Sequence, residues 1–129
     1  MFKDTKTFFS FSVNDLQKAK QFYTEVLGLS ASDTPEGLSI ELAGGGRLFI
    51  YNKGPRHQAA SFTVLNFIVD DVDRAVADLK SRGVQFEIYD GPDIKTDAQG
   101  IARGGDRGPT IAWFKDPAGN VLSVLESPT

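Results

Sequence analysis

Hydrophobic and polar residues alternate along two separate stretches of the chain, and each stretch is followed by a helical pattern. At 7–13 and 64–69, one set of alternate residues is apolar, which is typical of a β-strand with one buried face. At 16–27 and 72–79, apolar residues recur at helical spacing. A repeat of this kind indicates two similar halves, neither of which can bury its apolar face alone.

Polar residues and glycines predict where the two helices begin and end. Asn14 is expected to cap the first helix, with Gln17 as its partner in a capping box. Asp70 is expected to cap the second helix. Gly28 and Gly83 follow the apolar stripes and predict the helix ends, because glycine readily adopts the left-handed conformation found there.

Short strands and turns fill the rest of each half. After its helix, the first half has a polar stretch at 30–37, which leads into a hairpin. The strands expected after the helices are 38–42 and 47–51 in the first half, and 85–89, 110–115 and 121–125 in the second. A loop at 90–109 and a turn at 116–120 separate the later strands. Each half therefore consists of a strand, a helix and up to three further strands.

These elements predict a single α+β domain over 1–129, with a first module at about 5–53, a linker at 54–60 and a second module at about 61–129. Two such sheets placed edge to edge, with helices on the outer face, would enclose a concave inner face. Residues out of phase with the helix-packing set should point inward. They are Phe8, Ser10, Ser12, Phe49, Tyr51, Val64, Asn66, Ile68 and Ser123.

This inner set is mostly apolar with a few polar groups, which is the usual composition of a small-molecule site. The alternative is that neighbouring side chains fill the concavity. Trp113 and Tyr89 flank the long loop, where they could wall a pocket or pack in a core or dimer interface.

Charge and composition exclude some classes of binding partner. The chain has 129 residues, a net charge of −3 and no cysteine, so disulfides and thiolate sites are excluded. The sequence has no cluster of basic residues of the kind that binds nucleic acid. No apolar stretch approaches the ~20 residues that span a bilayer, and the N-terminus lacks the apolar core of a secretion signal. We expect a soluble cytoplasmic protein with no nucleic-acid or membrane partner.

Three motifs carry a resemblance to a known superfamily. They are VNDLQKAKQFYTEVLGL at 13–29, VDDV at 69–72 and FKDPAGN at 114–120. In combination they resemble the vicinal oxygen chelate superfamily, which includes glyoxalase I, extradiol dioxygenases, and fosfomycin and bleomycin resistance proteins. The resemblance covers nearly the whole chain. It implies paired βαβββ modules around a cleft, commonly in a homodimer.

The resemblance also implies where a divalent metal would bind. Superfamily enzymes usually hold the metal with His, Gln or Glu side chains from the first and last strands of the modules. The corresponding positions here hold Phe8, Val64 and Ser123, with Phe49 or Tyr51 as the candidate on the hairpin. These side chains are poor ligands for a divalent cation. We therefore expect no metal and no cofactor.

Other polar residues offer weaker candidates. His57, the only histidine, lies in the linker and is expected to be a solvated loop residue. Glu126 is three residues beyond Ser123, an odd offset that should direct it away from the cleft.

The long loop contains the remaining charged candidates. Loops of this length are often lids or binding loops. An arginine here, Arg103 above all, could pair with an anionic ligand group, although solvated charge is the simpler interpretation. The loop charges considered are Asp97, Arg103, Asp106 and Arg107.

Three functions remain open. The first is a metal-independent protein that sequesters an apolar or aromatic small molecule, as in the bleomycin-resistance branch. The second is a lyase, isomerase or dioxygenase-like enzyme with an atypical metal site, or with acid–base chemistry alone. The third is a dimeric accessory module with a vestigial cleft. The sequence does not decide whether the protein is an enzyme.

Overall fold

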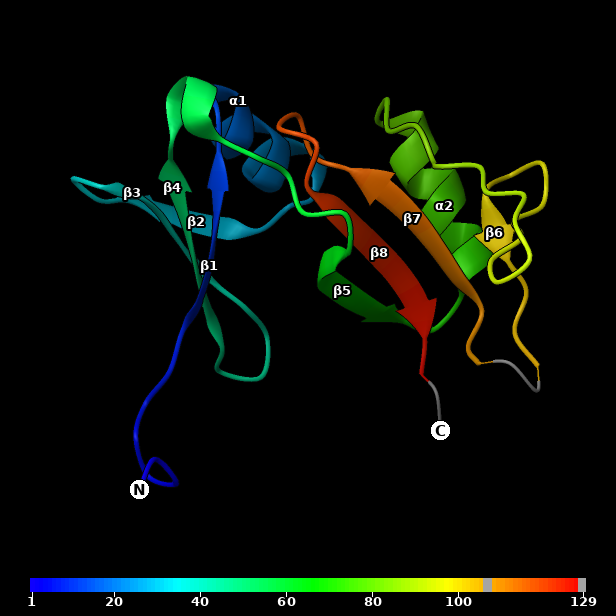
Figure 1. Cartoon of the computed structure of the whole chain (residues 1–129), viewed down its shortest axis with the longest axis horizontal. Helices are drawn as coiled ribbons and strands as arrows, with labels where there is room; N and C mark the ends of the chain where they lie inside the picture. The colour runs from blue at the N-terminus through cyan, green and yellow to red at the C-terminus, as the bar shows by residue number, and fades with distance from the viewer. Residues whose placement is uncertain (106–107, 128–129) are drawn as a thin grey trace. The chain divides into compact units, whose positions relative to one another are not determined.

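The repeat found in the sequence corresponds to two compact units, Met1–Ala59 and Ala60–Thr129 (Figure 1). The structure is a computed structural model and describes residues 1–105 and 108–127. Each unit contains one four-stranded mixed sheet with a helix, so the fold is α+β, built from two βαβββ-like modules. The predicted fold class is confirmed.

The first unit forms its sheet from strands on both sides of its helix. Its elements are β1 (Phe9–Val13), α1 (Leu16–Gln21), the π-helical turn η1 (Phe22–Val26), β2 (Ser30–Asp33), β3 (Gly37–Glu41) and β4 (Arg47–Asn52), followed by the 3-10 turn η2 (Gly54–Arg56). The strand order is β1-β4-β3-β2, with β1 parallel to β4 and the other pairs antiparallel.

Alternate residues of β1, β3 and β4 pack against the helix, as the period of two predicts. The buried apolar residues of this unit are Val13, Ala19, Tyr23, Leu38, Ile40, Leu48 and Ile50. Removing them from water is the main favourable contribution to folding. The opposite face of the sheet is left for other contacts.

The second unit repeats this arrangement. Its elements are β5 (Thr63–Val69), α2 (Val72–Ser81), β6 (Ile101–Ala102), β7 (Ile111–Lys115) and β8 (Val121–Glu126), with strand order β5-β8-β7-β6. Figure 1 shows α2 against one face of this sheet. The buried residues include Val72, Val76, Leu79, Ala112, Phe114, Leu122 and Val124. No helix within 1–105 and 108–127 is long and apolar enough to cross a membrane.

Both helices begin one residue later than predicted. Asp15 and Asp71, rather than Asn14 and Asp70, are the N-caps, and their backbones are extended. Each carboxylate accepts a hydrogen bond at 3.1 Å from the amide three residues on. An N-cap side chain must reach the amide three residues on. In both Asn14-Asp15 and Asp70-Asp71, the second residue has the position from which it can do so.

Two strand predictions were also wrong. The stretch 85–89 forms no regular strand: Phe86 makes a single bridge to Phe114, and the Glu87 amide donates to the Trp113 carbonyl at 2.8 Å. The short β6, from the long loop, forms the edge strand of the sheet and pairs with Ile111 and Ala112. Conversely, the polar stretch at 30–37 contains β2, which pairs antiparallel with β3.

Candidate functional site

A row of aromatic rings lies on the sheet face of the first unit that the helix does not cover. Phe8 packs edge-to-face on Phe49, with centroids 6.5 Å apart, and Phe49 stacks on Tyr51 at 6.1 Å. Ser10 pairs with Phe49 across the parallel strands, and Ser12 pairs with Tyr51. These five residues lie on one face of the first sheet, as the alternation along the strands predicted.

His57 also reaches this face, so the prediction of a solvated loop histidine was wrong. Its Nδ1 lies 2.7 Å from the Ser12 hydroxyl oxygen, and its ring is half-buried. The turn η2 causes this, because it follows β4 directly and folds the linker back. The Lys53 amide donates to the Val13 carbonyl at 2.9 Å, which holds the linker at the end of β1. The Gly54-Pro55 pair is the sequence signal for that turn.

The corresponding face of the second unit contains two polar pairs. The Ser123 hydroxyl donates to Asn66 Oδ1 at 2.6 Å, and the Trp113 indole donates to the Thr63 hydroxyl at 3.1 Å. Ser123 is fully buried whereas Asn66 is exposed, so Asn66 presents the polar group and Ser123 orients it. Ile68, on the same strand face as Asn66, is 71% exposed.

Val64 lies at an irregularity that the sequence pattern did not reveal. The pairing of β5 with β8 shifts register between Thr63 and Leu65, so Val64 is the extra residue of a β-bulge. Because a one-residue shift reverses the order of faces, the period-two prediction does not extend to this residue. Thr63, through its contact with Trp113, occupies the face instead.

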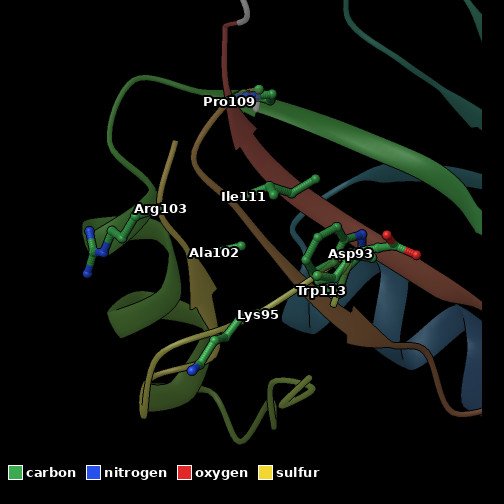
Figure 2. Close-up of a pocket in the computed structure, with 9 residues that line it drawn as sticks. Asp93, Lys95, Ala102, Arg103, Pro109, Ile111 and Trp113 are labelled. Atoms are coloured by element: carbon green, nitrogen blue, oxygen red, sulfur yellow. The ribbon is translucent and has the colours of Figure 1, made fainter. Parts of the chain in front are cut away.

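A hollow of about 370 Å³ lies beside Trp113 in the second unit (Figure 2). It is lined by Asp93, Ile94, Lys95, Ala102, Arg103, Gly108, Pro109, Ile111 and Trp113. The Trp113 ring packs edge-to-face on Tyr89, with centroids 5.5 Å apart. The volume of the hollow is within the range of small-molecule sites. Only Trp113 and Arg103 were predicted, because the other residues belong mainly to a loop with no periodic pattern.

Arg103 lines this hollow, but its charged group is engaged elsewhere. Its guanidinium binds both carboxylate oxygens of Asp73, at 2.7 and 2.8 Å, and one oxygen of Asp97 at 3.2 Å. Figure 2 shows the guanidinium directed away from Trp113. The Arg103 hydrogen bond lowers the pKa of Asp73, and the Ile101 amide, followed by other donors, lowers that of Asp97. Arg103 thus fastens the loop to the first turn of α2.

Glu126 faces away from the strand face that carries Asn66, as its odd offset predicted. Its carboxylate accepts a hydrogen bond at 3.0 Å from the amide of Val72, the first residue of α2. The negative charge is favourable beside the positive end of the helix dipole. This residue therefore has a structural role in joining β8 to α2.

The side chains at the metal-ligand positions do not fit a divalent cation. Phe8 and Phe49 have no donor atoms, Val64 lies at the bulge, and the Ser123 hydroxyl is bonded to Asn66. Over 1–105 and 108–127, no three His, Cys, Asp or Glu side chains are grouped so that they could hold a metal ion. Divalent sites need converging imidazole or carboxylate groups.

Comparison of the sequence with models of known protein families identifies the family of this chain. The family model described as "Glyoxalase/Bleomycin resistance protein/Dioxygenase superfamily" matches residues 7–124. The chain belongs to this superfamily. No curated protein matches it.

Solved structures extend the comparison. The chain is 27% identical to TnmS3, an antibiotic binding protein from Streptomyces sp. CB03234, with a TM-score of 0.69 over 100% of both chains. It is 30% identical to a glyoxalase/bleomycin resistance protein from the same organism, with a TM-score of 0.62 over 92% of this chain and 97% of the other. A lactoylglutathione lyase from Agrobacterium tumefaciens, 20% identical over 98% of this chain and 96% of the other, shares the fold with a TM-score of 0.64.

Proposed function

We propose that this protein binds an apolar or aromatic small molecule and sequesters it without a metal ion. The observation that carries this proposal is the hollow beside Trp113. Its lining combines an indole ring with Ile111, Pro109 and Ala102, and leaves Asn66 exposed on the adjoining strands. A mostly apolar concave surface with few polar groups suits a flat, apolar ligand.

The aromatic row of the first unit supports the same function. Phe8 is 64% exposed although it packs on Phe49, so its apolar surface remains available. Exposed aromatic rings bind planar ligands by stacking and edge contacts. On the second unit, the residues proposed to contact or orient the ligand are Asn66, Ile68, Trp113 and Ser123, with Arg103 holding the adjoining loop. On the first unit, the exposed face proposed for ligands of the same class is formed by Phe8, Ser10, Ser12, Phe49 and Tyr51.

The similarity to TnmS3 supports this choice among superfamily functions. That protein is described as antibiotic binding, and the chain matches it over its full length at 27% identity. Metal independence is proposed because the residues at the ligand positions lack suitable donor atoms. An aromatic antibiotic is therefore the first class of ligand to test.

The test uses the intrinsic fluorescence of Trp113, the only tryptophan. Chelator-treated protein is titrated with a panel of polycyclic aromatic antibiotics, and we expect saturable quenching by at least one of them. Ala102→Phe should fill the hollow and weaken that binding. Ala77→Phe, the same change at an exposed position of α2, is the control. Absence of quenching by the whole panel, or equal binding by the two variants, would contradict the proposal.

The Ser12–His57 pair favours one enzymatic alternative. A hydroxyl 2.7 Å from an imidazole nitrogen has the geometry of a nucleophile beside a general base. Such a pair could hydrolyse an activated ester without a metal. Hydrolysis of p-nitrophenyl acetate that is lost in Ser12→Ala would support this alternative, and no hydrolysis above the buffer rate would exclude it.

A further inference from the structure

A second hollow, of about 360 Å³, lies in the first unit along β2, β3 and the start of β4. It is lined by Ser30, Ala31, Ser32, Thr34, Ser39, Glu41 and Arg47. Hydroxyl groups dominate this lining, in contrast to the apolar surroundings of Trp113. The two hollows therefore differ in the chemistry that they can recognise.

Strand register places this hollow beside the aromatic row. Ser32 pairs with Ser39 across β2 and β3, and Ser39 pairs with Phe49 across β3 and β4. Paired residues project from the same face of a sheet, so hydroxyls and a half-exposed ring share one surface. Asp33 lies out of phase with this set and binds Lys20 of α1 at 2.8 Å.

The only charged groups that line the hollow neutralise each other. Arg47 Nη2 lies 3.3 Å from Glu41 Oε1 across the strand pair. A free cation or anion gains little from such a pair, because the partner charge offsets the attraction. A neutral ligand with many hydroxyls gains more, since each hydroxyl can donate to Glu41 and accept from Arg47 or a serine.

We propose that this hollow binds a neutral sugar, either free or as the glycosyl group of a larger molecule. The apolar C–H face of a pyranose would lie on the Phe49 ring, whose π face is weakly negative. Its hydroxyls would exchange hydrogen bonds with Ser32, Ser39 and the Arg47–Glu41 pair. The inference goes beyond the proposed function, because the ligand is a sugar and the seven residues that line the hollow are not used there. Phe49 alone is shared by the two proposals.

Chemical shifts of labelled protein test the proposal directly. Methyl glycosides of glucose, galactose, mannose and rhamnose are titrated at millimolar concentrations, while the amides of Ser32, Ser39 and Phe49 are followed. At least one glycoside should shift these signals saturably. The 4-nitrophenyl derivative of that sugar should bind more tightly if the natural ligand is a glycosylated aromatic compound, and equally if it is a free sugar.

Variants assign the binding to this hollow. Ser39→Val removes a hydroxyl, and Glu41→Gln replaces a charged hydrogen-bond acceptor by a weaker neutral one, so each should weaken glycoside binding by about fivefold. Asp33→Asn is the matched control, because it also removes an acid from an exposed ion pair of the same unit, but on the other sheet face. Glu41 is exposed, so its replacement should leave the fold intact.

Two results would overturn the proposal: no glycoside shifts the three amides, or the Asp33→Asn variant weakens binding as much as Glu41→Gln. Neither result bears on quenching of Trp113 by aromatic antibiotics, which reports on the second unit. Failure of the sugar site and failure of the proposed function are therefore distinguishable.

Discussion

Phe67 and Ile68 are neighbours on β5, yet their surroundings differ. Phe67 pairs with the buried Val124 and is itself half-buried, whereas Ile68 pairs with Leu125 and is 71% exposed. Alternation along the strand therefore separates a residue that contributes to the core from one that is available to a ligand.

Substitutions at these two positions should have opposite effects. Phe67→Ala should lower the free energy of unfolding by about 3 kcal/mol, the lower end of the range for loss of a phenylalanine from a core. Ile68→Ala should change it by less than about 0.5 kcal/mol, as is usual for an exposed site. Urea denaturation measures both values. Equal destabilisation by the two variants would contradict the face assignment.

The candidate site was predictable where side chains follow regular strand periodicity. Phe8, Ser10, Phe49 and Tyr51 share a face for that reason. The bulge at Val64 was not predictable, since an extra residue depends on how β8 aligns with β5. The contact of His57 with Ser12 depends on a turn that joins residues distant in sequence.

At the scale of elements, the segment 97–103 is held in place by a small charged network. Asp97 accepts hydrogen bonds from the amides of Gln99 and Ile101, and Arg103 connects it to Asp73 on α2. Ala102 and Arg103 line the hollow beside Trp113, whereas Asp73 does not. Arg103 therefore links Asp73 to the hollow.

Asp73→Asn should loosen this segment without touching a ligand directly. Faster amide exchange at Gln99 and Ile101 and weaker aromatic binding are expected at neutral pH. The pKa values of Asp73 and Asp97 are lowered below the ordinary 3.8, so their stabilisation is present above that pH and is lost as pH falls below it. The difference in exchange between wild type and variant should shrink below pH 3.8. A pH-independent difference would show that charge is not its cause.

Most elements were predictable because their periodicity is strong, but boundaries and edges were not. Both helices were predicted, but each predicted N-cap is one residue before the observed one. Two adjacent polar residues precede each helix, and the sequence pattern does not distinguish which of them is the cap. The predicted strand at 85–89 is reduced to a single bridge, from Phe86 to Phe114, and β6, drawn from the loop, pairs with the preceding residues Ile111 and Ala112 of β7. Ile88, which is exposed, and Tyr89, which is half-buried, have high strand propensity. Whether such residues form a strand depends on pairing with a neighbouring strand.

For the whole molecule, we expect removal of metal to have no effect. Dialysis against a chelator should leave the melting temperature and the binding of aromatic antibiotics unchanged, because the side chains at the superfamily's ligand positions do not fit a divalent cation. Elemental analysis of the purified protein provides the control. Stoichiometric zinc, nickel, manganese or iron that stabilises the fold would contradict this expectation.

We also predict a homodimer. Superfamily resemblance implies it, and a small chain gains additional buried surface by association. Light scattering at micromolar concentration should give twice the 14.0 kDa mass of the chain. A mass of one chain across that concentration range would count against the prediction.

The chain has one histidine and one tryptophan, and they fall in different units. The imidazole of His57 lies beside Ser12 on the first sheet, and the indole of Trp113 lies beside Thr63 on the second. Each ring gives proton resonances that no other residue of its type can overlap. A one-dimensional spectrum of the unlabelled, unsubstituted protein can therefore tell which of the two sheets an added compound occupies.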